Sequence, residues 1–187
     1  MGISIKIRSL LLGIGLISII LAPSSLMAQE RSVTSGEART VLNTLKYIRG
    51  IERKQGEVMI GVLFSEDIPG SEVLARRAAQ ELESQKNILK KIKVRAVKAS
   101  LRSFQQGLPP DILIVPSLMA GSYPRIKEVS RKNKVITISL DSACVREQVC
   151  AIGIESGGST EIYLNEKVLS ESGYDVDAAF KYMAIRL

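Results

Sequence analysis

Apolar residues group along the chain in two ways, as short continuous runs and as positions at helical spacing. Residues 58–64, 112–115 and 135–140 form continuous runs with the length of strands. A run without polar alternation is typical of a parallel strand that is covered on both faces. In residues 92–96, by contrast, apolar side chains alternate with lysine and arginine, which predicts a strand nearer an edge of the sheet.

Stretches with helical spacing lie between these runs. Thr34 and Glu37 form a T-x-x-E capping box that predicts the start of the first helix. Ser71 is expected to cap a second helix, and residues 122–132 have the pattern of a third. Helix and strand therefore alternate along most of the chain, which argues for a parallel sheet with helices on both faces.

After residue 140 the pattern changes. Residues 149–155 and 160–164 are predicted to be two strands joined by a glycine-containing turn, as in an antiparallel hairpin. Asn165 and Asp177 are expected to begin two further helices. The last helix is predicted to carry an apolar face, with Phe180 beside it, made of Ala179, Tyr182, Met183 and Leu187. The predicted fold class is α/β, a three-layer sandwich of Rossmann-like or flavodoxin-like type with a mainly parallel sheet and a C-terminal antiparallel hairpin.

The first 28 residues have the composition of a secretory signal peptide. Lys6 and Arg8 precede the uncharged run 10–22, and Ala28 offers a small residue before the expected cleavage point. The run is short for a membrane-spanning helix, which needs about 20 residues, although an uncleaved anchor remains an alternative. We expect residues 29–187 to form a single domain outside the cytoplasm. Residues 1–28 hold two basic residues and no acidic one, so their removal lowers the formal net charge from +7 to +5.

Cys144 and Cys150 are the only cysteines of the chain. Export places them in an oxidising compartment. A turn between two strand ends can bring their Cα atoms within the roughly 4.4–6.8 Å that a disulfide needs. We therefore expect a disulfide that staples this turn. Two free buried thiols and a redox-responsive bridge remain alternatives, whereas the spacing differs from the C-x-x-C of thiol-redox enzymes.

The available side chains restrict the chemistry. Histidine is absent, so neither a Ser-His-Asp nor a Cys-His catalytic set can form. Two cysteines cannot complete a structural zinc site, and neither a Walker motif nor G-x-G-x-x-G occurs. We therefore expect no enzymatic activity, no cofactor and no metal. Nucleic acid is not an expected partner either, because the compartment is wrong and aromatic residues make up only 4% of the chain.

Polar residues follow several of the predicted strands. In an open α/β sheet, ligands bind outside the carboxyl ends of the strands, which here means the loops 65–71, 116–122 and 141–144. Serines near helix starts can help to hold a small anion. The candidate residues for a ligand or partner at this edge are Ser65, Ser71, Ser117, Ser122 and Asp141. These loops do not identify a particular ligand.

Several stretches together resemble the YfiR family of exported α/β regulatory proteins. They are V-L-N-T-L-K-Y-I followed by V-M-I-G-V-L-F, then D-I-L-I-V-P and V-I-T-I-S-L-D, and the ending from E-I-Y-L-N-E-K-V-L to D-A-A-F-K-Y-M. The pattern covers nearly all of the chain after residue 28. The sequence departs from the family after Ile48, where R-G-I-E-R replaces an aromatic pair, and this puts a family-type partner contact in doubt.

The resemblance implies a regulatory role rather than catalysis. Family members act in the periplasm and are associated with inhibition of an inner-membrane diguanylate cyclase, with effects on cyclic-di-GMP signalling and biofilm. A regulator of this kind is expected to expose an apolar patch for its partner. The alternative is a single-lobe small-molecule-binding protein associated with a transporter, which predicts a pocket at the strand ends. A homodimer remains an open alternative in both cases.

Overall fold

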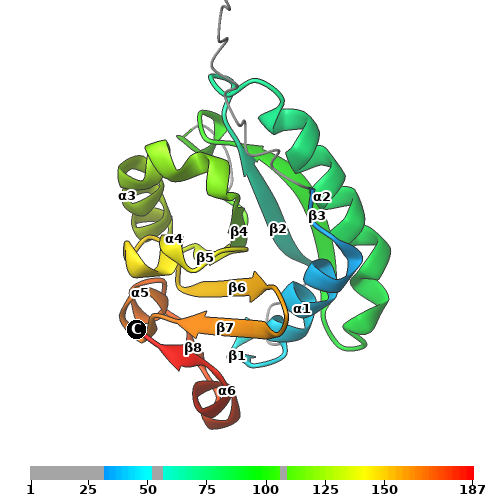
Figure 1. Cartoon of the computed structure of the whole chain (residues 1–187), viewed down its shortest axis with the longest axis vertical. Helices are drawn as coiled ribbons and strands as arrows, with labels where there is room; N and C mark the ends of the chain where they lie inside the picture. Colours follow the sequence, from blue (N-terminus) through cyan, green and yellow to red (C-terminus); the bar gives the residue numbers. More distant parts are fainter. Residues whose placement is uncertain (1–31, 52–56, 106–108) are drawn as a thin grey trace, which may run out of the picture.

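The computed structural model describes residues 32–51, 57–105 and 109–187, which form one α/β unit (Figure 1). The predicted signal peptide, residues 1–28, lies outside the described residues. Within the described ranges, no helix combines the length and the apolar composition that a membrane crossing requires.

Helices and strands alternate through most of the chain. The α-helices are α1 (Ser35–Leu45), α2 (Ser71–Gln85), α3 (Tyr123–Asn133), α4 (Ala143–Arg146), α5 (Glu166–Glu171) and α6 (Ala178–Met183), and the 3₁₀ helices are η2 (Lys86–Ile88), η3 (Ser103–Gln105) and η4 (Ser117–Ser122). The strands are β1 (Ile48–Arg49), β2 (Glu57–Phe64), β3 (Lys93–Ser100), β4 (Ile112–Val115), β5 (Ile136–Ser139), β6 (Ile152–Ser156), β7 (Thr160–Leu164), β8 (Asp175–Val176) and β9 (Ile185–Arg186).

The main sheet has seven strands in the order β3-β2-β4-β5-β6-β7-β9. All pairs from β3 to β6 are parallel, and β6 and β7 form the antiparallel hairpin that the sequence predicts. β9 then returns parallel to β7 and becomes the second edge strand. The prediction of an α/β fold with a mainly parallel sheet is confirmed. A separate two-stranded antiparallel sheet, β1 with β8, is an addition that the apolar pattern did not predict.

Side chains of the central strands alternate between two cores. On β4, Ile112 and Ile114 belong to the core that also contains residues of α1, α2, α5 and α6. Leu113 and Val115 belong to the opposite core, which contains residues of α3 and α4. Figure 1 shows the same division, with α2 beside β2 and β3, and with α3 and α4 at the other side of the sheet. The molecule therefore has the three layers that were predicted.

The helix starts confirm most of the predicted caps. The Thr34 hydroxyl accepts from the Glu37 amide, and the Glu37 carboxylate accepts from the Thr34 amide, as in a capping box. Asn165 and Asp177 cap α5 and α6 through side-chain oxygens. The prediction that Ser71 caps α2 is wrong, because the N-cap is Gly70, whose left-handed φ of 79° suits a glycine.

The last helix also differs from the prediction. α6 ends at Met183, and its buried residue is Phe180, which packs on Tyr47 with ring centroids 5.5 Å apart. Ala184 is extended, with φ −89° and ψ 147°, so the helix stops and the chain can pair with β7. The apolar face predicted for this helix is exposed instead, namely Ala179, Tyr182, Met183 and Leu187.

Candidate functional site

A cavity of about 870 Å³ lies at the carboxyl ends of β4 and β5, where the sequence places a ligand-binding edge. Its walls come from the segment after β4, the first two turns of α3 and the turn after β5. The lining residues are Ser117, Ala120, Tyr123, Pro124, Lys127, Asp141, Ala143, Glu147 and Val149. Two of the predicted edge residues, Ser117 and Asp141, are therefore brought together at one cavity.

The other predicted edge residues do not line this cavity. Ser65 follows β2, and its carbonyl accepts a hydrogen bond of 2.7 Å from the Ser71 hydroxyl. The same hydroxyl donates to the Ile68 carbonyl at 2.8 Å, so it closes its own loop. Ser122 is the N-cap residue of α3, but its side chain makes no capping hydrogen bond. The structure therefore gives these three serines local positions outside the cavity.

Asp141 is fixed at the cavity wall by hydrogen bonds to the end of β5 and to the start of α4. Its Oδ1 accepts from the Cys144 amide at 3.1 Å, and its own amide donates to the Ser139 hydroxyl at 3.3 Å. The Ser139 hydroxyl in turn donates to the Val115 carbonyl at 3.0 Å, which ties the end of β5 to the end of β4. The second carboxylate oxygen, Oδ2, is buried and has no hydrogen-bond partner among the described residues. Asp141 therefore holds a fixed carboxylate in the cavity wall, and its buried oxygen Oδ2 lacks a hydrogen-bond partner among the described residues.

A disulfide stiffens the wall that follows Asp141. Cys144 and Cys150 are joined, with their Cα atoms 5.2 Å apart, and both residues are fully buried. The bridged segment contains one turn of helix, α4, and then reverses at Gln148, whose φ is 56°. The bridge closes because the helix stops after one turn. The cavity residues Glu147 and Val149 lie inside this stapled segment.

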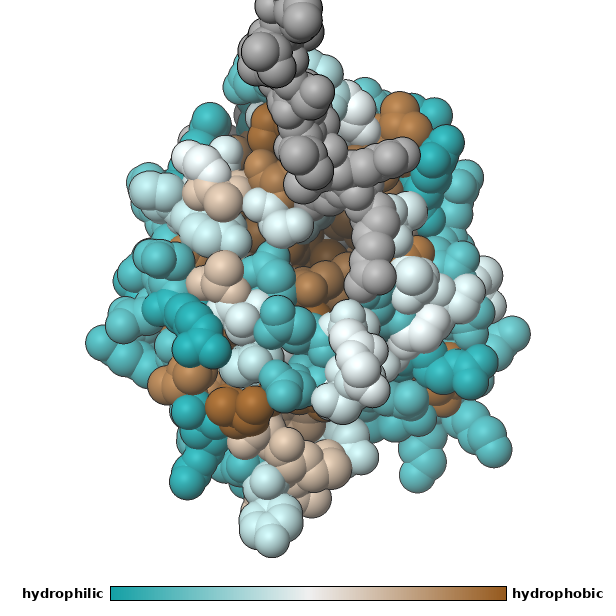
Figure 2. Space-filling view, viewed as in Figure 1, coloured by the Kyte–Doolittle hydropathy of each residue, from teal (hydrophilic) through white to brown (hydrophobic). Residues whose placement is uncertain are grey.

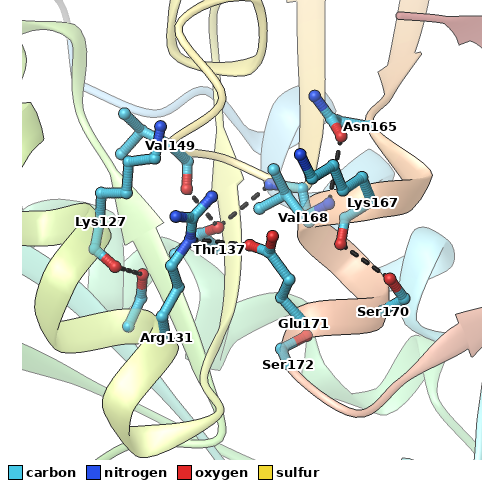
Figure 3. Close-up of polar contacts among 12 residues, drawn as sticks. Lys127, Arg131, Thr137, Val149, Asn165, Lys167, Val168, Ser170, Glu171 and Ser172 are labelled. Carbon is cyan, nitrogen blue, oxygen red and sulfur yellow. Dashed lines mark hydrogen bonds and ion pairs between the residues drawn. The ribbon is translucent and has the colours of Figure 1, made fainter.

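Close packing fixes the position of the stapled segment against the sheet. A Cβ atom added at Gly153 of β6 would meet Val145 Cγ2 at 2.8 Å and the Asp141 carbonyl at 3.0 Å. Glycine is therefore required there for α4 to approach β6 so closely. The Thr137 hydroxyl of β5 donates to the Val149 carbonyl at 2.9 Å and accepts from the Ala151 amide at 3.0 Å (Figure 3).

The opposite wall is the start of α3. Tyr123, Pro124 and Lys127 line the cavity, while Ile126 and Val129 of the same helix are buried in the core. Farther along the helix, Arg131 points toward Glu171 of α5, and the Arg131 Nε and Glu171 Oε2 atoms are 2.7 Å apart (Figure 3). This ion pair joins α3 to the C-terminal part of the chain.

Three charged residues line the cavity, and their chemistry suits a ligand with both kinds of charge. Lys127 lies on α3, Asp141 lies just before the disulfide-bridged segment, and Glu147 lies within it. None of the three makes an ion pair with another described residue. An ammonium group on the ligand would match the carboxylates, and a carboxylate on the ligand would match Lys127. Residues 32–51, 57–105 and 109–187 contain no cluster of acidic, cysteine or histidine residues that suits a metal ion.

Another polar group lies along the same edge, at the ends of β2 and β3. The Ser100 hydroxyl donates to the Glu66 carboxylate, and this hydrogen bond is the main reason why the pKa of Glu66 lies below its usual value. The positive charges of Arg102 and Arg125 lower the pKa further. Glu66 therefore remains ionised at neutral pH and adds a negative charge to the edge.

Sequence reasoning missed most of the cavity wall. Tyr123 and Lys127 are four positions apart and so lie on one face of α3, but that spacing is equally typical of a solvated helix face. Glu147 was hidden inside the segment between the cysteines. The spacing of the cysteines could have pointed to Glu147, because a short disulfide-bridged turn restricts the directions of the side chains inside it.

The chain matches no protein-family model and no curated protein sequence. Its fold is similar to those of several solved structures. One is a substrate-binding protein with adhesive properties from Clostridium difficile in its ligand-free, open form, with a TM-score of 0.55 and 18% identity over 83% of this chain and 60% of that chain. Another is the ABC domain of a Streptococcus pneumoniae protein in complex with L-Trp, with a TM-score of 0.56 and 13% identity over 80% of this chain and 59% of that chain.

A conserved domain protein from Vibrio cholerae has a TM-score of 0.55 and 13% identity, over 80% of this chain and 59% of that chain. The chain therefore spans about three fifths of the length of each of these proteins. At these identities the similarity concerns the fold alone.

Proposed function

We propose that this protein is an exported binding protein whose small-molecule ligand occupies the cavity at the ends of β4 and β5. The observation that carries the proposal is the position of Ser117 and Asp141, which follow adjacent parallel strands and line one cavity. The carboxyl edge is where α/β sheets bind ligands. The volume, about 870 Å³, is in the range of small-molecule sites. The similarity of the fold to substrate-binding proteins supports the same conclusion.

The ligand class that fits best is a small zwitterion with an apolar body. Lys127 lines the same cavity as the carboxylates of Asp141 and Glu147, and the lining also includes the apolar side chains of Pro124, Ala120 and Val149. One of the similar solved proteins is described in complex with L-Trp, a molecule of this class. Because this chain spans only part of the length of those proteins, its association with a transporter is part of the proposal.

Binding is tested with the exported protein and four probes that separate the two charges. We expect L-tryptophan and glycine, both zwitterions, to raise the melting temperature more than propylamine or propionate does, since a bound ligand stabilises the folded state. Isothermal titration then gives the affinity. The proposal is wrong if no probe changes the melting temperature and a broader screen of small metabolites also finds none that does.

Variants locate the ligand in the cavity. Asp141→Asn keeps an Oδ1 acceptor for the Cys144 amide but removes the charge, and Lys127→Gln removes the opposite charge. Each is expected to weaken binding by about tenfold or more, the loss of one charge-assisted hydrogen bond. Lys132→Gln, on the same helix but outside the cavity lining, is the matched control. Equal effects of Lys127→Gln and Lys132→Gln would place the ligand elsewhere.

The regulatory role that the YfiR resemblance implies is our second candidate. In that role the protein would inhibit a membrane-bound signalling protein such as a diguanylate cyclase. The observation that favours it is an exposed apolar surface at the C-terminal end, since a docking protein needs such a surface. Crosslinking in intact cells, followed by identification of membrane proteins bound to the chain, tests this role. Recovery of no membrane protein would remove the candidate.

A further inference from the structure

We infer that the protein docks on an anionic lipid surface through a group of basic side chains at the start of β3. Residues 86–98 contain six basic residues and no acidic residue. Four of them, all exposed, form what we name the basic surface, namely Lys90, Lys91, Lys93 and Arg95. In Figure 2, hydrophilic residues (teal) cover the lower right of the molecule, where Figure 1 shows the end of α2. The basic surface therefore extends from the connection after α2 into the edge strand β3.

The basic surface differs from the cations beside it because it has no partner within the chain. At one end of the run, Lys86 Nζ lies 2.9 Å from the Glu83 carboxylate, and at the other end Lys98 pairs with Glu72. The four residues of the basic surface, by contrast, make no ion pair with another described residue. Their charge is therefore available to a partner outside the chain.

Nearby carboxylates offset only part of this charge. Glu57 is the neighbour of Lys93 on β2 and is exposed. The Glu83 carboxylate is already bound to Lys86 and accepts a hydrogen bond of 2.6 Å from the Ala96 amide. The run itself contributes no acidic residue. Positive charge therefore exceeds negative charge beside the basic surface, and a cluster of four or more cations attracts anionic lipid headgroups.

The kind of side chain favours a lipid surface over a folded protein. Three of the four residues are lysines, whose ammonium groups are point charges on flexible stems that reach outward from the sheet. Lysine is depleted at protein interfaces, where arginine and aromatic residues are enriched. None of the four lines the cavity, and Lys93 and Arg95, two positions apart, project to the same face of β3. Mobile charges on an open edge suit phosphate groups that are themselves mobile.

The topology of the sheet sets how the protein would lie on the lipid. β2, β3, β4 and β5 are parallel, so they begin at the same end of the sheet, and Lys93 is the first residue of β3. The ligand cavity lies at the opposite end, beyond β4 and β5. Docking through the basic surface would therefore leave the cavity open to the surrounding solution. This inference does not depend on the proposed ligand.

Co-sedimentation with lipid vesicles tests the inference. The exported protein is expected to bind vesicles of an equimolar mixture of phosphatidylglycerol and phosphatidylcholine, and not vesicles of phosphatidylcholine alone. Binding should fall steeply at about 1 M salt, where the Debye length is only about 3 Å. Lys90→Gln/Lys91→Gln is expected to weaken binding by about tenfold or more. The matched control is Lys132→Gln/Lys134→Gln, which removes two exposed charges at the end of α3, on the other side of the sheet, and should bind like the wild-type protein.

Three results would overturn the inference. One is equal binding to both kinds of vesicle, which would show that charge is not the cause. Another is an equal loss of binding for the two double variants, which would mean that net charge alone attracts the lipid. The third is the absence of binding to anionic vesicles. If Lys90→Gln/Lys91→Gln then loses a crosslink to a membrane protein in intact cells, the basic surface contacts an acidic protein instead. Circular dichroism of both variants checks that the fold is intact.

Discussion

The Thr137 hydroxyl on β5 holds the Val149 carbonyl at 2.9 Å and so connects the sheet to the stapled wall of the cavity. The same oxygen accepts from the Ala151 amide at 3.0 Å, and the residue is buried. Thr137→Val keeps the shape but leaves a buried carbonyl without this donor. We expect a loss of about 1–3 kcal/mol in the free energy of unfolding, which urea denaturation measures.

Thr160→Val is the control for this prediction. Thr160 lies at the exposed start of β7, and the same change there is expected to alter stability very little. If the two variants lose similar stability, the Thr137 hydroxyl does not anchor the wall. The Thr137 variant is also expected to bind cavity ligands more weakly, since Val149 lines the cavity.

The disulfide between Cys144 and Cys150 is expected to stabilise both the fold and the cavity. For a loop of about seven residues, the chain-entropy estimate is about 2.4 kcal/mol. Comparing urea denaturation of the oxidised and the reduced wild-type protein measures the cross-link alone, because both sulfur atoms remain. Since both cysteines are buried, we expect reductant to act slowly until denaturant is added.

The double variant Cys144→Ala/Cys150→Ala tests whether the disulfide affects ligand affinity independently of its effect on stability. Glu147 and Val149 line the cavity from within the bridged segment, so the variant should bind ligand more weakly at a temperature where it remains folded. Unchanged affinity would mean that the turn keeps its shape without the bridge. Fast reduction without denaturant would contradict the burial of the sulfur atoms.

Patterns that extend over several residues made most of the fold predictable. The continuous apolar runs predicted β2, β4 and β5 correctly, because both faces of these strands are buried. The strands β1, β8 and β9 have two residues each, which is too short to show any period, so their pairing depends on contacts distant in the sequence. The same limit explains the error at the end of the chain. The predicted last helix extended to Leu187, whereas α6 ends at Met183 and the chain continues as the short strand β9.

The candidate site was predictable only in part. Ser117 and Asp141 were found because they directly follow strands that lie side by side. Ser71 was misplaced because its hydroxyl satisfies carbonyls of its own loop, a contact that the sequence does not reveal. Lys127 is indistinguishable in sequence from the solvated lysines of the same helix.

Two like charges face each other on the hairpin. Glu155 and Glu161 are cross-strand partners on β6 and β7, and both are exposed. Like charges directly opposite each other are destabilising, so Glu155→Lys is expected to stabilise the protein by about 0.2–1 kcal/mol, and less at high salt. Thermal unfolding at low and high salt measures this effect.

Glu161→Lys is the informative comparison for the hairpin. Glu161 accepts a 2.6 Å hydrogen bond from the Tyr163 hydroxyl, which is the main reason why the pKa of Tyr163 lies above its usual value. Reversing this charge removes the repulsion but also removes the acceptor, so a smaller gain is expected. Equal gains for both variants would show that the tyrosine contact is of no consequence.

The ion pairs of Lys181 make the stability of the protein depend on pH in the acid range. The ammonium group of this lysine hydrogen-bonds Glu166 and Asp175, and these hydrogen bonds are the main reason why the pKa of each carboxyl lies below its ordinary value of 4.5 or 3.8. A carboxyl whose pKa is lower in the folded state stabilises the protein above its unfolded-state pKa. That contribution is lost as the pH falls through the folded-state pKa.

Replacing Lys181 therefore has a pH-dependent effect. Lys181→Gln is expected to lower the melting temperature near pH 7 and to have a smaller effect near pH 3, where protonation has already removed the contribution of the carboxylates in the wild-type protein. Lys167→Gln, an exposed change on α5, is the control and should lower the melting temperature equally little at both pH values. A constant difference between Lys181→Gln and wild type from pH 3 to pH 7 would mean that Lys181 acts through packing rather than through its ion pairs. Because both carboxylates are partly solvated, the whole effect should shrink in high salt.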